Sequence, residues 1–303
     1  MSKILICGGS GLVGKNLCGS LQDRGYEVAI MSRTKNLYPS IPTYLWDLNK
    51  NEIDTKALNE AEIIINLAGV NIGEKKWSHK RKNEIVDSRV KSGELIFNSI
   101  SKTNNKLKVF ITASAIGYYG STTSKIIFEE ESKAADDFLG KTCKKWEQVN
   151  DKFINIGIRT VAIRTAVVLT KEGGALSKII MPIKIGIGSA IGNGKQYFPW
   201  IHIIDLCGIY IKAIEDQKMT GAYNAVAPEH ITNQEFTKKV AQTLKKPFWF
   251  PKIPAIFMKL IFGEMAVILL EGSRVSSEKI RASSYKFLHP KVDLALKDLL
   301  VNK

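Results

Sequence analysis

Apolar and polar positions alternate in blocks along the first half of the chain, and the blocks have the lengths of strands and helices. The run Lys3–Cys7 predicts a short apolar strand, and a helical pattern with leucine and valine on one face follows it as far as Gly25. Residues 26–31 predict a second strand, which completes a β-α-β unit. The chain is therefore expected to begin as an α/β fold.

The same alternation continues to residue 165. Isoleucine and valine run through the later strands, as in central parallel strands that helices cover on both faces. This pattern predicts a doubly wound parallel sheet. The expected strands lie at residues 62–66, 108–112 and 158–164, and the expected helices at residues 78–101 and about 136–155.

After residue 165 the pattern loosens, and glycines mark a loop-rich region. Helical patterns return at residues 206–216, at residues 233–245 and from Ala255 to the C-terminus. We expect residues 1–165 to form one domain, with segments at about 195–230 returning to it, and residues 166–303 to form a smaller α/β lobe. That lobe would cover the carboxyl edge of the sheet, where ligands bind in this architecture.

The most apolar segment, residues 253–270, is interrupted by Pro254, Lys259, Gly263 and Glu264. It is too interrupted to span a bilayer, so we expect a buried or amphipathic helix. The N-terminus begins with an apolar strand instead of a basic region and a signal-peptide cleavage site. No membrane segment is predicted.

Composition and charge add little to this picture. Hydrophobic residues make up 45% of the chain and charged residues 24%, as in ordinary globular proteins. The net charge of +15 would suit nucleic acid, an anionic membrane surface or a phosphorylated small molecule. The lysines are scattered, however, and the densest helical stretch, residues 75–91, also holds Glu84 and Asp87. We therefore expect solvated lysine faces and no nucleic-acid or membrane partner.

The four cysteines, Cys7, Cys18, Cys143 and Cys207, form no Cys-x-x-Cys pair. Their spacing suits neither a zinc site nor a disulfide framework. We interpret them as reduced thiols of a cytoplasmic protein, and we predict no metal site.

A glycine turn follows the first strand. Its glycines are spaced as in dinucleotide-binding turns, where they allow a tight turn, a close approach to the pyrophosphate and close helix packing. The following helix presents free N–H groups and its positive dipole end to the anion. A turn without a ligand is the alternative, and the position between a strand and a helix favours the cofactor. The residues predicted to contact the cofactor here are Gly8, Ser10, Gly11, Leu12, Val13 and Gly14.

The end of the second strand indicates which dinucleotide binds. An NAD site usually has an acidic residue here for the ribose 2′-hydroxyl, whereas this chain has Ser32, Arg33 and Lys35. Such side chains suit the 2′-phosphate of NADP(H). The alternative is a solvated arginine in a loop. The position and the missing acid favour NADP(H), bound on a Rossmann-type sheet.

Two further turns complete the predicted cofactor site. Asp47 follows a third strand, and it either accepts a hydrogen bond from the adenine amine or begins a turn. The fourth strand closes at Asn66 and continues as Leu67, Ala68 and Gly69, and the small residues of this turn suit a close approach of the backbone to the cofactor.

Several motifs together resemble a known family. The glycine turn and Asn66-Leu-Ala-Gly69 resemble the extended short-chain dehydrogenase/reductase superfamily. More specific motifs are Asp87-Ser-Arg-Val90, Ser114-Ala-Ile-Gly-Tyr-Tyr-Gly120, Asp136-Asp-Phe-Leu139, Trp146-Glu147, Trp200-Ile-His202, Asp205-Leu206, Gly263-Glu-Met265 and Arg274-Val275. Over essentially the whole chain they resemble the "epimerase family" branch of atypical reductases, sometimes labelled SulA-type. The resemblance implies an NADP-binding Rossmann domain and a short C-terminal domain of undefined function at about residues 248–298, and it implies no known substrate.

The usual catalytic pair of these reductases is missing. Their mechanism uses a serine or threonine together with a tyrosine and a lysine four residues apart, and the lysine lowers the tyrosine pKa. Ser114 stands where the serine is expected, although a strand-end hydroxyl also satisfies backbone groups. Leu139 and Cys143 stand where the tyrosine and lysine should be. We interpret Cys143 as a buried structural cysteine.

Other side chains are candidates for the missing roles. Tyr118 and Tyr119 lie just beyond the candidate serine, and one of them is expected to face the nicotinamide. Arg89 and Arg164 would bind an anionic substrate group or the cofactor, or would serve as ion-pair partners.

The segment 200–206 holds one more candidate. His202 is either a proton donor or a core histidine that holds its loop. Asp205 precedes a helical pattern, so we expect it to be the helix N-cap.

Two functions of different class fit these residues. The first is an enzyme that uses NADP(H) for oxidoreduction or epimerisation of a small sugar-like or anionic substrate. The second is a non-catalytic NADP(H)-binding protein that senses redox state or regulates a partner. The missing tyrosine and lysine favour the second, and the candidate serine, tyrosines and histidine favour the first. Superfamily members often dimerise through two helices that would correspond here to residues 78–101 and 136–155, and the charged faces of these helices leave a homodimer open.

Overall fold

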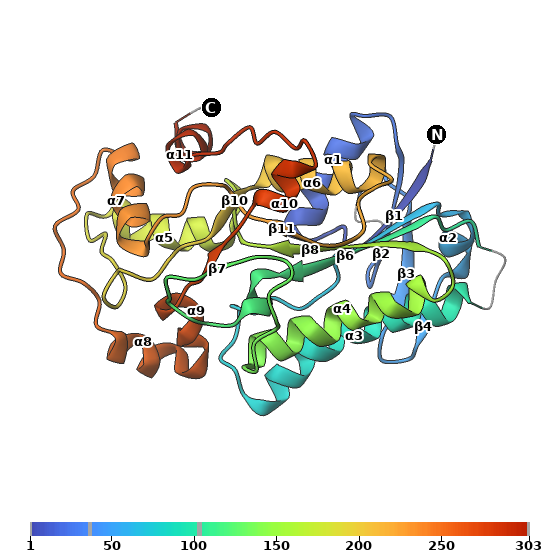
Figure 1. Cartoon of the computed structure of the whole chain (residues 1–303), viewed down its shortest axis with the longest axis horizontal. Coiled ribbons are helices and arrows are strands. Elements are labelled where there is room, and N and C mark those ends of the chain that lie inside the picture. Colours follow the sequence, from blue (N-terminus) through green and yellow to red (C-terminus); the bar gives the residue numbers. More distant parts are fainter. Residues whose placement is uncertain (1, 36–37, 102–104, 302–303) are drawn as a thin grey trace.

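The computed structural model describes residues 2–35, 38–101 and 105–301. Its centre is an eight-stranded sheet in the order β11-β8-β6-β5-β1-β2-β3-β4 (Figure 1). Every neighbouring pair is parallel except β3 and β4. The strands are β1 Lys3–Cys7, β2 Glu27–Ser32, β3 Thr43–Asp47, β4 Glu52–Ile53, β5 Ile63–Asn66, β6 Val109–Ala115, β8 Arg159–Thr165 and β11 Gly221–Ala225. The prediction of a doubly wound α/β fold is confirmed.

Helices cover both faces of the sheet. One face carries α1 (Leu12–Gln22) and α6 (Ile203–Glu215), and the other carries α2 (Thr55–Glu60), α3 (His79–Ile100) and α4 (Phe138–Ile154), as Figure 1 shows. The alternation of side chains along a strand explains this arrangement. Ile4 and Ile6 of β1 belong to the core beneath α1 and α6, whereas Leu5 and Cys7 belong to the core on the opposite face.

Side-chain caps set where the two long helices begin. The Ser78 hydroxyl accepts the Arg81 N–H at the start of α3, and the Asp137 carboxylate accepts the Gly140 N–H at the start of α4. Serine and aspartate are preferred at this position because their oxygens satisfy the free N–H groups of the first turn.

The strand order reverses at β1, and in open α/β sheets such a reversal forms a crevice at the carboxyl edge. From β1 the chain moves outward through β2 and β3, and it then returns to place β5 on the other side of β1. Ligands of open α/β sheets bind where the order reverses in this way. The crevice between β1 and β5 is therefore the expected binding site.

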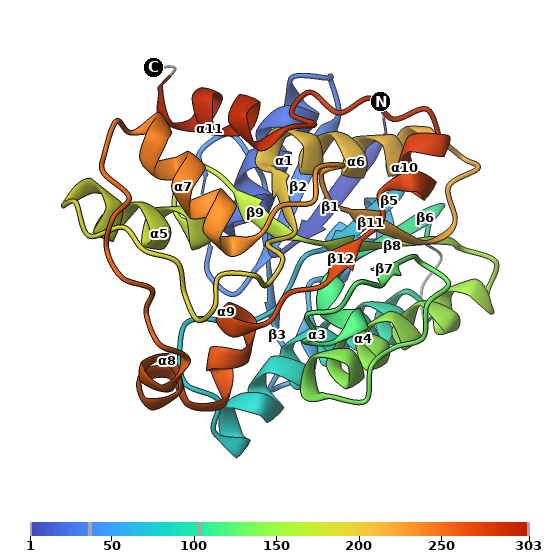
Figure 2. The same ribbon diagram turned by 60° about the vertical axis from the view of Figure 1, so that its left-hand side comes forward.

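A smaller lobe lies beside the carboxyl edge. It holds α5 (Gly174–Lys184), α7 (Asn233–Thr243), α8 (Ala255–Phe262), α9 (Val267–Leu270) and α11 (Val292–Leu300), and Figure 2 shows α5, α7 and α8 on one side of the molecule. Its core includes Leu176, Trp200, Phe236 and Leu296. Two short sheets lie beside it. β9 (Val167–Leu169) pairs with β10 (Trp200–His202), and β7 (Ile127–Phe128), from the first part of the chain, pairs with β12 (Arg274–Val275).

The C-terminal region differs from the helical pattern predicted from Ala255 onward. The short elements η2 (Gly263–Ala266), β12 and α10 (Glu278–Ala282) interrupt it. Gly263 has a φ of +60°, which favours glycine and ends α8. Met258 is the only buried side chain of α8, so of the two expectations for this segment, a buried or an amphipathic helix, the buried helix does not apply to α8. No helix among the described residues is long and apolar enough to cross a membrane.

Candidate functional site

The glycine turn between β1 and α1 leaves no room for side chains. Gly8 has a φ of +82°, and a Cβ there would lie 3.0 Å from backbone atoms of both Leu67 and Ala68. A Cβ on Gly14 would lie 2.6 Å from the Gly8 carbonyl oxygen. The turn, the end of β5 and the first turn of α1 are therefore packed backbone against backbone at the crevice.

The N-terminus of α1 is open at this point. Gly11 is the N-cap, no side chain caps the helix, and its first turn holds no acidic residue. Ser10 and Gly11 are exposed, and Leu12 and Val13 are half-buried. The first N–H groups of a helix have no partner within the helix and carry partial positive charge, so this end can bind a phosphate group.

The turn after β5 forms the other wall. Asn66 is fully buried, its amide donates to the Ser92 hydroxyl at 3.0 Å, and its Oδ1 accepts the Ala68 N–H at 3.2 Å. These bonds hold the turn against Gly8. Gly69 is exposed, and a Cβ there would lie 3.1 Å from Cζ of Arg89.

Arg89 lies beside that turn with its charge unpaired. Its Nη1 donates to the Ile85 carbonyl at 2.9 Å, and its guanidinium lies over the Trp146 ring, 4.9 Å from the ring centroid. Burial lowers the pKa of Arg89 to about 10. No carboxylate among the described residues forms an ion pair with it, so an anionic ligand group would complement its charge.

At the end of β2, Arg33 is exposed and has no ion-pair partner in the described part of the chain. Ser32 is buried, and its hydroxyl accepts the Thr34 N–H at 3.3 Å. Asp47, at the end of β3, accepts the N–H groups of Asn49 at 2.8 Å and Lys50 at 3.4 Å. Asp47 therefore begins a turn, and its contact with an adenine amine stays a prediction.

A buried ion pair occupies the region where the catalytic residues are expected. The Arg164 guanidinium donates from Nε to Oε1 and from Nη2 to Oε2 of Glu147, both at 2.8 Å. The Ser114 hydroxyl donates to Glu147 Oε1 at 2.5 Å. Burial opposes the charge of Arg164, but the Glu147 carboxylate outweighs it and raises the pKa of Arg164. Ser114 is thus engaged with a carboxylate.

Glu147 received no role from the sequence. Leu139, Cys143 and Glu147 are four residues apart on α4, so they share one face of that helix. A Cβ on Gly117 would lie 3.4 Å from Leu139 Cβ and 3.8 Å from Cys143 Sγ, which shows that this face meets η1 (Ile116–Tyr119). Glu147 could have been identified from the sequence, because it follows Leu139 and Cys143 at the same spacing of four residues.

Cys143 is a protonated thiol at neutral pH. Its side chain is buried, and burial raises its pKa to about 12. Neither it nor Leu139 can transfer a proton there in the way that a tyrosine and lysine pair does.

The two adjacent tyrosines have different surroundings. Tyr119 is buried, donates to Asn224 Oδ1 at 2.7 Å and accepts from Arg164 Nη1 at 2.9 Å. Burial raises the pKa of Tyr119. Tyr118 is half-buried, its ring lies 3.5 Å from Cζ of Arg164, and its hydroxyl has no hydrogen-bond partner among the described residues. Tyr118 is therefore the candidate whose hydroxyl is free to meet a substrate.

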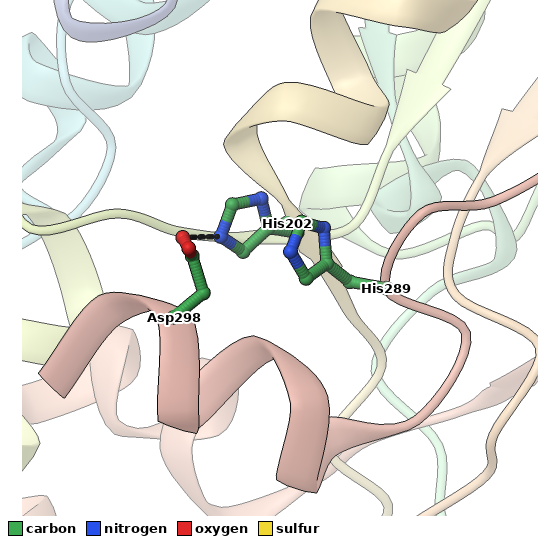
Figure 3. A group of neighbouring side chains, drawn as sticks. All are labelled: His202, His289 and Asp298. Atoms are coloured by element: carbon green, nitrogen blue, oxygen red, sulfur yellow. Dashed lines mark ion pairs between the residues drawn. The ribbon is translucent and has the colours of Figure 1, made fainter. Parts of the chain in front are cut away.

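His202 lies between α6 and the C-terminal segment (Figure 3). Its Nδ1 accepts the Ile204 N–H at 3.2 Å, which caps α6, and its Nε2 lies 3.3 Å from Asp298 Oδ2. The ring stacks on His289 with 3.7 Å between centroids. The expectation that Asp205 is the N-cap is wrong, because His202 takes that position and Asp205 follows in the first turn.

Asp205 instead anchors the segment before α11. Its fully buried carboxylate accepts the N–H groups of Leu288 at 2.7 Å and His289 at 2.9 Å. Such bonds satisfy a charge that burial would otherwise disfavour.

The side chains of His202, His289 and Asp298 lie close enough to be considered as a metal site, with donor atoms within 4.8 Å of one another. The Nδ1 of His202 accepts a backbone N–H, so the proton of the neutral ring is on Nε2 and that atom is not free to ligate. The two imidazole rings are stacked with an angle of 25° between their planes, so their nitrogen lone pairs do not converge on one point between the rings. The cluster is better explained by contacts within the protein.

The stability of the fold is expected to depend on the charge of His202. Burial and the neighbouring His289 lower the pKa of His202 to about 4, below the ordinary histidine value of about 6.5. The folded chain therefore binds fewer protons than the unfolded chain between these pKa values. The stabilisation is complete above pH 6.5 and is lost as the pH falls toward 4. Urea unfolding at pH 7.0 and pH 4.5 measures the loss, for which we expect about 2 kcal/mol.

His202→Asn is the matched control for this prediction. Asparagine keeps an oxygen that can cap α6 but has no proton to gain. The variant should show a smaller loss of stability between pH 7.0 and 4.5 than the natural chain. The same pH dependence in both would contradict the assignment to His202.

Similar proteins match the chain along its whole length. Residues 4–226 match the NAD dependent epimerase/dehydratase family, and residues 253–299 match a domain of unknown function, DUF1731. The chain is 33% identical to the mouse epimerase family protein SDR39U1, with 98% of this chain and 99% of that protein covered. It is 32% identical to the epimerase family protein YfhF of Bacillus subtilis, with 99% and 98% covered. The resemblance stated from the motifs is confirmed.

A solved structure gives the same picture. The crystal structure of human SDR39U1 (isoform 2) with NADPH superimposes with a TM-score of 0.88 at 31% identity, and the match covers 99% of this chain and 100% of that chain.

Proposed function

Because this chain belongs to the NAD dependent epimerase/dehydratase family, we propose that it binds NADP(H) in the crevice between β1 and β5. We further propose that it uses the cofactor for oxidoreduction or epimerisation of a small sugar-like or anionic substrate. The observation that carries the cofactor assignment is the open N-terminus of α1 behind the glycine turn, together with the unpaired Arg33 at the end of β2. The NADPH in the human relative supports it.

Two side chains support the proposed chemistry. The hydroxyl of Tyr118 is the proton carrier that we propose, because it has no hydrogen-bond partner among the described residues and its ring lies on the Arg164 guanidinium. Arg89 would pair with a negative group of the substrate or cofactor beside Gly69. NADP(H), when bound, would supply the hydride.

The cofactor proposal predicts a selective effect of Arg33→Ala. Loss of charge-assisted hydrogen bonds to the 2′-phosphate should weaken NADPH binding by about 10- to 100-fold, and NADH binding should be nearly unchanged. Titration calorimetry with both cofactors measures the two affinities. Lys125→Ala, which removes an exposed lysine elsewhere, is the control and should alter neither. Equal losses for NADPH and NADH would show that Arg33 does not bind the 2′-phosphate.

One observation favours a second function. Leu139 and Cys143 replace the usual acid–base pair, and Ser114 donates to Glu147. A chain with an intact cofactor site and these substitutions would suit a non-catalytic NADP(H) sensor or regulatory protein.

Replacement of Tyr118 distinguishes the two functions. The full chain would be incubated with NADPH or NADP⁺ and a panel of small carbonyl, hydroxy-acid and sugar compounds, and nicotinamide absorbance and product stereochemistry would be followed. For an enzyme, Tyr118→Phe should lower turnover by about 10²- to 10⁴-fold with NADPH affinity retained. Tight NADPH binding without turnover on any compound would favour the sensor. Turnover that survives Tyr118→Phe would remove this tyrosine from the mechanism.

We also propose a reducing compartment for this protein and retain the prediction of a homodimer. All four cysteines are buried and free, which supports a reducing compartment such as the cytoplasm. The homodimer through α3 and α4 stays a prediction.

A further inference from the structure

Large apolar side chains cover the outer face of α8. Ile256 is 64% exposed, Phe257 55%, Leu260 70% and Ile261 55%. Their spacing of one, four and five residues places them on one continuous stripe of the helix. Figure 2 shows α8 at the lower edge of the molecule, away from the large sheet.

The loop before α8 extends this surface. Trp249 is 69% exposed and Phe250 42% exposed, and their rings lie 5.8 Å apart. Six large apolar side chains within residues 249–261 are therefore in contact with water. Single exposed apolar residues are ordinary, but a group of this kind marks a surface that another body covers. We call these six residues the α8 face.

The charge along α8 and the loop before it is positive. Residues 245–263 hold four exposed lysines, Lys245, Lys246, Lys252 and Lys259, and no aspartate or glutamate. The exposed Glu264 that follows α8 is paired with Lys82, and the net charge of the chain is +15. Lys252 and Lys259 are exposed next to the apolar stripe. Exposed tryptophan, phenylalanine and leucine with an excess of lysine beside them are typical of helices that lie in the interface of an anionic membrane.

We propose that the α8 face docks on the surface of an anionic lipid bilayer, with α8 lying in the plane of the interface. The apolar stripe would enter the boundary between headgroups and acyl chains, and the lysines would meet the lipid phosphates. The proposal differs from the expectation of no membrane partner, which was based on the lysines being scattered along the chain. The structure leaves the apolar side chains of this segment exposed beside its lysines.

The charge also argues against a second copy of the chain as the occupant. A two-fold contact through this face would place the same residues of both copies against each other. The lysines that border the stripe would then face one another, and the acidic side chain next to α8, Glu264, is already paired with Lys82. An anionic bilayer supplies the opposite charge.

Vesicle co-sedimentation tests the proposal. The full chain is mixed with vesicles of phosphatidylcholine alone and with vesicles that contain phosphatidylglycerol. We expect binding to the anionic vesicles, at least about 10-fold weaker binding to the neutral ones, and weakening by added salt. Trp249 fluorescence should shift to shorter wavelength on binding, and Trp249→Phe should remove that shift.

Two variants separate the apolar and the charged contributions. Leu260→Ser should weaken binding about 10-fold or more, because a leucine side chain is lost from the interface. The pair Lys246→Glu and Lys259→Glu should weaken it by at least about 30-fold. Leu294→Ser on α11, where the leucine is 48% exposed, is the matched control and should bind as the natural chain does. Urea unfolding verifies that each variant is folded.

Three results would overturn the proposal. One is no sedimentation with anionic vesicles, and another is binding that Leu260→Ser and Leu294→Ser weaken equally. The third is concentration-dependent dimerisation in light scattering that Leu260→Ser abolishes, which would assign the α8 face to a second copy. The measurements need no cofactor, so they stand apart from the NADP(H) proposal.

Discussion

Glu147→Leu is expected to lower the free energy of unfolding by about 3–5 kcal/mol. Arg164 is 3% exposed, and Glu147 is its only carboxylate partner among the described residues. Without Glu147, the guanidinium would keep its charge in a buried site with only the Tyr119 hydroxyl and the Glu130 carbonyl as acceptors. A buried charge that loses its partner costs far more than an exposed one, because no water replaces the lost contact. Urea unfolding at pH 7 measures the change.

Two further variants show whether the charge is the cause. Glu147→Leu combined with Arg164→Met removes both charges and should recover much of the lost stability. Asp87→Asn breaks the exposed pair between Asp87 and Lys91, whose side chains are about half exposed, and should cost no more than about 0.5 kcal/mol. A loss below about 1 kcal/mol for Glu147→Leu would show that the buried pair stabilises the fold no more than a surface pair does.

The same ion pair shows where inference from the sequence stops. The glycine turn and the strand end at Arg33 were predicted because strand, turn and helix follow one another within about 30 residues, and local rules decide them. Ser114, Glu147 and Arg164 come from β6, α4 and β8, and Glu147 lies 33 residues after Ser114 and 17 residues before Arg164. Their contact depends on β6 and β8 being neighbours in the sheet, which no local pattern specifies.

Asp205 and α8 show two other limits. A local capping rule assigned Asp205 to the N-cap, but its partners Leu288 and His289 lie more than 80 residues further along the chain. The burial of the Asp205 carboxylate is possible because those distant N–H groups donate hydrogen bonds to it. For α8, the apolar pattern predicted a buried or amphipathic helix. Such a pattern does not show whether other parts of the chain bury the apolar side chains.

Gly14→Ala is expected to weaken NADPH binding by up to about 100-fold. A Cβ at this position would lie 2.6 Å from both the Gly8 carbonyl oxygen and the Gly9 Cα. Both are backbone atoms of the glycine turn, so no side-chain rotation can make room and α1 must move away from β1. The N–H groups at the start of α1, which we propose to hold the pyrophosphate, would move with it. Titration calorimetry with NADPH measures the loss, and circular dichroism verifies that the variant is folded.

Gly19→Ala is the matched control, because Gly19 lies on the same helix and a Cβ there would meet nothing within 4 Å. Alanine loses less backbone entropy than glycine when a helix forms, so this variant should be more stable by up to about 1 kcal/mol and should bind NADPH unchanged. A folded Gly14→Ala variant with the NADPH affinity of the natural chain would show that the glycine turn does not position the cofactor. Equal weakening of NADPH binding by both substitutions would assign the effect to α1 as a whole. The close approach of Gly14 to Gly8 would then not explain it.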